Sequence, residues 1–229
     1  MSREKLQELF DCIVQDDPEN PILSIVDIHS CATLKNNVVT ELKIPSSNIR
    51  TLPHIIGKFL HLVNLNMGNN ILTELPDEIT TLHNLRYLDL GMNRLEWLPE
   101  DIGNLSQLEH LDIRWNRLKY LPISLFSLPK LETLDLFFNS LTRISPKISG
   151  LISLRELNLE QNLLQTLPIE VLSLPNLKVL NLRKNRLHSL PSFENCHLES
   201  LDISENSELS LDQEQMDYLL SIGCNIILN

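Results

Sequence analysis

The sequence predicts an elongated α/β solenoid, with a parallel β-sheet on one side and short helical turns on the other. Two observations predict this fold. The pattern L-x-x-L-x-L-x-x-N-x-L-x-x-L-P recurs along most of the 229 residues, and apolar and polar residues alternate inside each copy. A repeat of this length is typical of stacked structural units. The units start at Val39, Leu62, Leu85, Leu108, Leu131, Leu154, Leu177 and Leu198, with six steps of 23 residues and a last step of 21.

Each unit begins with a short predicted strand. In the unit that starts at Leu108, Leu111 and Ile113 point inward and Asp112 points outward, because successive side chains of a strand alternate between its faces. A single unit cannot bury its leucines, whereas stacked units bury them from both sides. Each buried leucine contributes about 1.5–3 kcal/mol. The stacking of neighbouring units therefore provides the core.

Two further repeat positions have predicted structural roles. From the second unit on, the ninth position is asparagine, whose amide can satisfy backbone groups left unpaired where the strand turns. Proline closes most units and is displaced by one residue, to Pro146, in the fifth. Proline followed by acids, as in Leu75–Ile79, suits the first turn of a helix. We therefore expect short helical turns on the side opposite the sheet.

The pattern resembles the leucine-rich-repeat family from Val39 to Asn206. Its "LPxxIxxL" ending is similar to the intracellular 23-residue class, which includes Ras-suppressor-like and scribble-type proteins. Stand-alone leucine-rich-repeat effectors of intracellular bacteria such as Legionella have similar repeats. The resemblance implies a curved horseshoe whose parallel sheet is concave, and a role in binding other proteins.

Both ends are expected to cap the solenoid. We predict an N-terminal helical cap and a degenerate opening repeat over residues 1–38, leucine-rich repeats over 39–206, and a C-terminal cap over 207–229. Ser210 with Gln213 resembles the capping box of a helix, and 225–229 predicts a final strand. Helical spacing is shown by Leu6, Leu9, Phe10, Ile13 and Val14, and the repeat is matched by Leu23, Val26 and Ile28. An N-terminal helix that docks a partner is the alternative.

Composition argues against several classes of function. The net charge of −11 and the pI of about 5.0 do not favour nucleic acid or anionic lipid. No stretch approaches the roughly 20 apolar residues of a membrane span, and the first residues lack the apolar run of a signal peptide. The four cysteines form no CxxC pair, which favours a reducing compartment. We expect a cytoplasmic monomer, or a protein secreted into a host cytosol if it is a bacterial effector.

The candidate binding residues occupy outward-facing positions on the predicted concave face, since function lies in what the scaffold leaves free. Units three to six carry aromatic and charged side chains where such repeats usually have small ones. Trp, Tyr and Arg dominate binding hot spots, and clustered exposed phenylalanines are typical of an interface. The residues predicted to contact a protein partner are Tyr87, Met92, His110, Arg114, Trp115, Phe137, Phe138, Glu160 and Arg183.

Several of these positions have structural alternatives. Trp115 and Phe138 occupy the eighth position, which can tuck under the turn, so packing is an alternative to binding. Aspartates at the fifth position of three adjacent units look like a metal site. Leucine-rich repeats commonly carry Asp or Asn there, so we predict no metal. The arginines of the tenth position form either a basic edge or a solvated surface: Arg94, Arg117 and Arg186.

The sequence favours a non-catalytic adaptor that binds a protein partner. His110, near Asp89 and Asp112, is the one acid–base grouping, and it lacks a serine or cysteine nucleophile in register. The chain has no phosphate-binding glycine loop. We therefore expect neither enzyme activity nor a cofactor. The alternative is a bacterial effector that redirects or inhibits a host signalling or ubiquitin-pathway protein.

Overall fold

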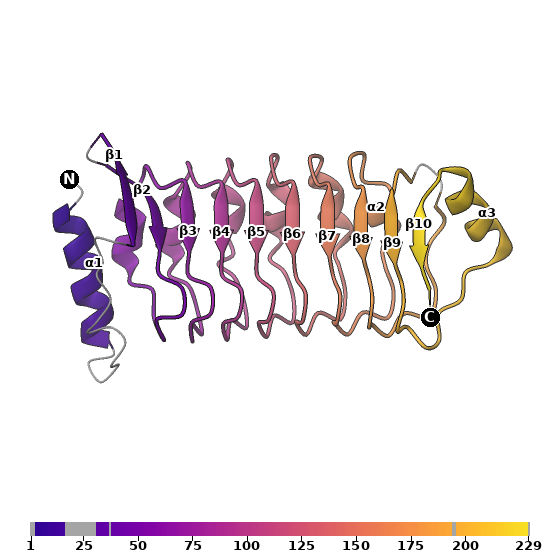
Figure 1. Ribbon diagram of the computed structural model, residues 1–229, viewed down its shortest axis with the longest axis horizontal. Coiled ribbons are helices and arrows are strands. Elements are labelled where there is room, and N and C mark those ends of the chain that lie inside the picture. The colour runs from indigo at the N-terminus through magenta and orange to yellow at the C-terminus, as the bar shows by residue number, and fades with distance from the viewer. Residues whose placement is uncertain (1–2, 17–30, 37, 194–195, 229) are drawn as a thin grey trace.

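The computed structural model describes residues 3–16, 31–36, 38–193 and 196–228. The chain forms one elongated row of stacked units, with a helix at each end (Figure 1). Each repeat adds one strand to a continuous sheet and one connection behind it. The predicted solenoid is therefore confirmed.

A ten-stranded sheet runs the length of the row, in the order β1 to β10. From β2 onward the strands are parallel, and equivalent repeat positions lie side by side, as Leu88 beside Leu111 and Leu111 beside Leu134. The strands are β1 (Ala32–Lys35), β2 (Val38–Lys43), β3 (Asn64–Asn66), β4 (Tyr87–Asp89), β5 (His110–Asp112), β6 (Thr133–Asp135), β7 (Glu156–Asn158), β8 (Val179–Asn181), β9 (Ser200–Asp202) and β10 (Asn225–Ile227). We call the outward side of this sheet the strand face.

The first strand departs from the prediction of a wholly parallel sheet. β1 is antiparallel to β2, with Ala32 opposite Leu42. Asn36, which follows β1, has a φ of 50°, a left-handed conformation in which Asn is enriched. The sequence signal for this hairpin was the Asn36–Asn37 pair, of a residue type that favours turns, directly before the β-branched run Val38–Thr40. The strand predicted around Leu23, Val26 and Ile28 lies outside the described residues.

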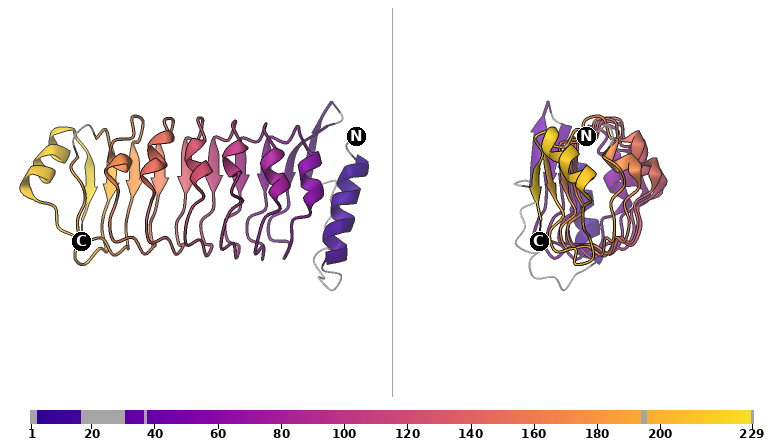
Figure 2. Two further views of the ribbon diagram at one scale, coloured as in Figure 1. Left: turned by 180° about the vertical axis from the view of Figure 1, so that it is seen from behind. Right: turned by 90° about the vertical axis from the view of Figure 1, so that its right-hand side faces the viewer.

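Short helices form the back of the row, behind the strands (Figure 2). They follow the closing proline in units one to four and in unit six, as predicted, and in unit five the helix begins at the displaced Pro146; among the described residues after Pro191, in unit seven, no short helix forms. In the fifth unit, where the proline is displaced, Ser145 caps the helix by accepting a hydrogen bond from the Lys147 amide (3.2 Å). The short helices are η1 (His54–Lys58), η2 (Asp77–Thr81), η3 (Ile102–Asn104), η4 (Ile123–Ser127), η5 (Pro146–Gly150) and α2 (Ile169–Leu172).

The core is a column of aliphatic side chains enclosed between the sheet and these helices. Leu111, Leu134 and Leu157, at the centres of three successive strands, are each 1% exposed. Their outward neighbours in the same strands are only half-buried or exposed. The alternation expected from the sequence is therefore present, and it leaves every second strand side chain on the strand face.

A second buried column consists of the repeated asparagines. In the part of the chain that the structure describes, Asn70, Asn93, Asn116, Asn139, Asn162, Asn185 and Asn206 are all buried. Asn116 Nδ2 donates to the carbonyl oxygens of Ile113 (3.1 Å) and of Leu90 in the preceding unit (2.9 Å), while its Oδ1 accepts from the Leu95 amide (2.9 Å). Each amide thus satisfies backbone groups of its own turn, as predicted, and also joins that turn to the unit before it.

The two ends are covered by helices. α1 (Arg3–Asp16) packs Leu6, Leu9 and Ile13 into the core and lies beside the first units in Figure 1. α3 (Gln213–Ser221) precedes β10. The predicted capping box was misplaced by two residues: Asp212 accepts from the Gln215 amide, and the Gln215 side chain accepts from the Asp212 amide. Asp212 is the N-cap because it directly precedes α3, whereas Ser210 lies two residues earlier in the chain.

Asn116→Ala is expected to destabilise the protein by about 2–3 kcal/mol, because it leaves buried carbonyl and amide groups without their partner. Urea denaturation followed by circular dichroism measures the change. Asn104, an exposed residue of η3, provides the control, and Asn104→Ala should cost less than about 1 kcal/mol. Equal losses in the two variants would show that the asparagine column does not join the units.

Candidate functional site

Two of the predicted site residues, Tyr87 and His110, form a stacked pair at the start of neighbouring strands. Tyr87 of β4 and His110 of β5 are register partners, and their rings stack with centroids 4.6 Å apart. His110 Nδ1 lies 2.7 Å from the Thr133 hydroxyl of β6, which holds the imidazole in place. Tyr87 remains 43% exposed. The pair therefore places two parallel rings side by side on the strand face.

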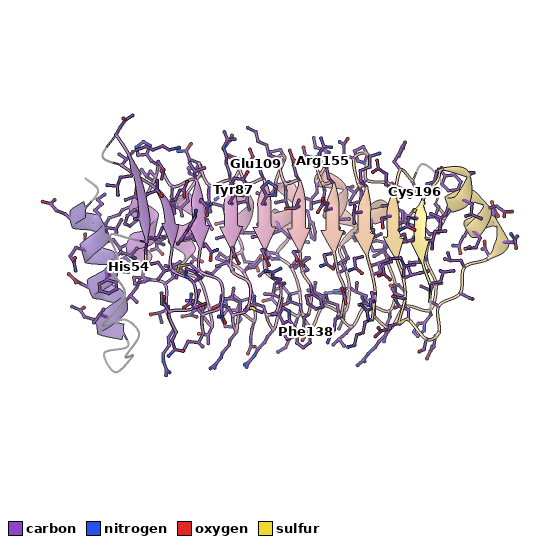
Figure 3. All side chains as sticks on the ribbon, viewed as in Figure 1. His54, Tyr87, Glu109, Phe138, Arg155 and Cys196 are labelled. Atoms are coloured by element: carbon purple, nitrogen blue, oxygen red, sulfur yellow. The ribbon has the colours of Figure 1, made fainter. Side chains whose placement is uncertain are left out.

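A second aromatic group lies beyond the opposite ends of the strands, and Figure 3 shows Phe138 at that edge, away from Tyr87. The Trp115 and Phe138 rings stack with centroids 4.0 Å apart. Phe137 meets Trp115 edge-on at 5.6 Å. We call Trp115, Phe137 and Phe138 the aromatic cluster. Phe137 and Phe138 are half-buried and Trp115 is 41% exposed, so none of the three belongs to the core.

The eighth position of the repeat has a left-handed backbone. Met92, Trp115 and Phe138 have φ angles of 56°, 54° and 55°, and Asn69 has 54°. Asparagine is tolerated in this region, whereas a bulky residue there costs about 1–2 kcal/mol. Met92 is 47% exposed. At the eighth position Met92 and Trp115 are therefore exposed, whereas Phe138 is half-buried.

Charged residues flank the aromatic cluster. Arg114 Nε lies 3.3 Å from Asp112 Oδ2. Arg183 pairs with Glu205 and lies 3.8 Å from Glu160 Oε1. Asn181 Nδ2 also donates to Glu160 Oε2 (2.9 Å). Glu160 and Arg183 thus form a network of their own beside the cluster.

The aspartates at the fifth position have a structural role in each turn. Asp89, Asp112 and Asp135 each accept a hydrogen bond at 3.0 Å from the backbone amide two residues later. Asn158 and Asn181 make the same bond in their own units. Among the residues that the structure describes, no group of three or more His, Cys, Asp or Glu side chains is arranged to hold a metal ion.

The aspartate column also carries an electrostatic cost. Burial raises the pKa of Asp112 to about 6, and neighbouring Asp135 and Asp89 act in the same direction. Burial likewise raises the pKa of Asp135. These carboxylates are hydrogen-bonded to the backbone but incompletely neutralised. A cation brought to them would stabilise their charged form.

Two family models match the chain, one described as a leucine-rich repeat region over residues 77–157 and one as a leucine rich repeat over 152–207. They match the part of the chain in which the strands, short helices and asparagine column repeat. The chain is a leucine-rich-repeat solenoid. No curated protein matches this sequence.

Solved structures support the same conclusion. A leucine-rich-repeat protein of Leptospira interrogans is 28% identical, with a TM-score of 0.65 over 81% of this chain and 54% of that one. The functional domain of InlJ from Listeria monocytogenes is 25% identical, with a TM-score of 0.68 over 86% of this chain and 41% of that one. The ectodomain of the Arabidopsis thaliana receptor kinase GASSHO1/SCHENGEN3 is 24% identical, with a TM-score of 0.70 over 90% of this chain and 29% of that one, and shows the fold alone. This solenoid therefore spans about half, or less, of the length of these proteins.

Neither family model describes an enzyme, and leucine-rich-repeat proteins are generally non-catalytic binding modules. His110, the acid–base candidate of the sequence, stacks on Tyr87 and bonds to Thr133. Cys196, next to His197, is buried as expected, and burial raises its pKa, which disfavours a reactive thiolate. None of the described helices has the length and apolar character needed to cross a membrane.

The repeat pattern did not reveal two kinds of hollow in this solenoid. One, of about 390 Å³, lies on the flank between the fourth and fifth units and is lined by Tyr120, Ile123 and Arg143 among others. The displaced Pro146, which also lines it, was the only signal in the sequence. Two further hollows lie along the strand face. These two hollows form between columns of side chains that come from several units, so the sequence of one repeat does not reveal them.

Asp112→Asn is expected to stabilise the solenoid at pH 7 by about 1–2 kcal/mol and to change little at pH 4. The folded-state pKa lies above the unfolded value, so the aspartate's contribution to stability falls as pH rises from about 4 to 6. Asparagine keeps the bond to the Arg114 amide, as Asn158 does in its own unit. Urea denaturation across this pH range provides the measurement. A difference between variant and wild type that does not grow with pH would refute the assigned cause.

Proposed function

We propose that this protein is a non-catalytic adaptor that binds a protein partner through its strand face. Leucine-rich-repeat domains are typical protein–protein interaction modules. The plant ectodomain of the same fold was solved in complex with CASPARIAN STRIP INTEGRITY FACTOR 2. The observation that carries the proposal is the partly exposed aromatic cluster, which extends into the left-handed eighth position.

The energetics of the aromatic cluster support this role. A left-handed Trp or Phe costs about 1–2 kcal/mol, and an aromatic pair contributes about 0.5–1.5 kcal/mol beyond its buried area. Stacking of Trp115 on Phe138 therefore only offsets the backbone cost and adds little net stability. Strained residues of this kind gather at sites of function. We assign the cluster, with Arg114 and Met92 beside it, to partner contact.

The stacked pair of Tyr87 and His110 extends this surface to the other end of the strands. Glu160 and Arg183 bound it on the C-terminal side through their own ion pairs. We place the protein in a reducing compartment, in accord with the free thiols of Cys12, Cys196 and Cys224. We also propose that the protein belongs to the intracellular 23-residue class of leucine-rich repeats and that it is a monomer.

The alternative function is that of a bacterial effector that redirects or inhibits a host signalling or ubiquitin-pathway protein. It is favoured by the identity of two structural relatives, which come from Leptospira interrogans and Listeria monocytogenes. Affinity capture from host-cell and from bacterial lysates separates the two candidates. An effector should retain a host-cell protein through its strand face, whereas an endogenous adaptor should retain a protein from a lysate of its own organism.

Phe137→Ala and Arg114→Ala are each expected to weaken partner binding by about 2 kcal/mol or more, because they truncate interface anchors. The measurement is isothermal titration calorimetry with the captured partner. Tyr120→Ala and Arg117→Ala are the matched controls, since both residues are exposed outside the proposed surface. Unchanged affinity in both test variants, or equal losses in the controls, would exclude this surface as the binding site.

Trp115→Asn separates binding from packing. Asparagine suits the left-handed backbone, as Asn69 does in the second unit. Relief of backbone strain should offset the lost stacking, so the free energy of unfolding should change by less than about 1 kcal/mol. Partner affinity should still fall about tenfold or more. A large loss of stability with intact affinity would identify Trp115 as a packing residue.

A further inference from the structure

The strand face contains a continuous trough that runs across the strands. One hollow, of about 300 Å³, is lined by residues from Asn64 in β3 to Glu156 in β7. A second, of about 220 Å³, extends from β6 to Asn181 in β8. The two share Thr133, Asp135 and Glu156, so they are parts of one trough. Its floor is the backbone of the buried central leucines, and its walls are the outward side chains on either side of them.

The walls of the trough are acidic. Asp89, Asp112, Asp135 and Glu156 line it, and its described lining includes no lysine or arginine. Arg114, which pairs with Asp112 at 3.3 Å, is the nearest cation that the structure records for these aspartates. The lining of the trough therefore carries a net negative charge. Complementarity of charge favours a cationic occupant and disfavours nucleic acid or an acidic segment.

One end of the trough has an aromatic wall. The stacked rings of Tyr87 and His110 both line it, and Tyr87 is 43% exposed. An aromatic ring beside carboxylates is the environment that a guanidinium or ammonium group prefers, since the ring face attracts the cation while the carboxylates pair with it. Arginine gains further from stacking its planar group on the ring. This wall is an observation independent of the acidic residues.

We propose that the trough binds an extended, arginine- and lysine-rich segment of the partner protein, which lies across β3 to β8. This inference rests on the proposed function and adds the chemistry of the partner. Six strands about 4.8 Å apart span roughly 24 Å, which an extended segment covers with about seven residues. The cations of the segment pair with the aspartate column, and one of them stacks on Tyr87.

The aspartate column offers a test that leaves the fold intact. Asparagine already occupies the fifth position of other units, where Asn158 and Asn181 make the same backbone hydrogen bond. The triple substitution Asp89→Asn, Asp112→Asn and Asp135→Asn therefore removes three charges and keeps every turn. The control removes three exposed charges from the back of the row, by Asp77→Asn, Glu78→Gln and Asp101→Asn.

Fluorescence anisotropy with labelled octa-arginine and octa-lysine measures binding at physiological ionic strength, where long-range attraction is screened. We expect the aspartate triple variant to bind octa-arginine about tenfold more weakly and the control variant less than about twofold. Tyr87→Ala should weaken octa-arginine more than octa-lysine. Glu156→Gln, which alters no turn, should weaken binding about threefold and serves as the test if the triple variant fails to fold.

Three outcomes would overturn the inference. Equal losses in the two triple variants would show attraction to net charge alone. Tetra-arginine or spermine binding as tightly as octa-arginine would show a site for small cations and not for a segment. No measurable binding of octa-arginine to the wild type would exclude an arginine-rich segment as the occupant of the trough. In that last case, loss of partner binding by Phe137→Ala would still support the adaptor function. Conversely, octa-arginine could bind while neither Phe137→Ala nor Arg114→Ala changes partner binding. That result would support the trough and reject the proposed function.

Discussion

The architecture depends on the buried asparagine column that joins each unit to the unit before it. The leucines supply most of the free energy, but hydrophobic packing is non-directional and does not by itself set register. The asparagine amide does so, because its donors and its acceptor meet backbone groups in two successive units at fixed positions. Every strand therefore lies at the same height as its neighbours, which brings equivalent residues of successive repeats into columns.

This constraint also determines where binding chemistry can lie. To bring the asparagine into the core, the chain reverses at the residue before it, and that residue takes a left-handed backbone in every described unit from the first to the eighth. Most units place a small or polar residue at this position, whereas Trp115 and Phe138 place large rings there. The scaffold thus converts two unusual residues into a partly exposed surface next to the strand face. The same register aligns Asp89, Asp112 and Asp135 into one wall of the trough.

Much of the fold could be predicted from the sequence, because the repeat states the same structural requirement many times. The strand positions, the helical turns after the prolines and the asparagine column all followed from the 23-residue spacing. The β1–β2 hairpin and the true capping residue Asp212 did not, since they occur once each and depend on local geometry. The outward positions of Tyr87, His110 and Phe137 were predictable, but their division into a stacked pair and a separate cluster was not. The conformation of the eighth position and the trough depend on contacts between units, which one repeat does not contain.

Hydroxyl-radical footprinting of the partner-bound and the free protein tests the central claim most directly, because aromatic and sulfur-containing side chains are the ones most readily oxidised. The chain has such oxidisable side chains both on the proposed surface and outside it. Tyr87, Met92 and Trp115 lie on the proposed surface, while Trp97 and Tyr120 are exposed to a similar degree outside it. The account predicts that partner binding protects the first set and leaves the second unchanged. Protection of Trp97 and Tyr120 with continued oxidation of Trp115 would contradict it.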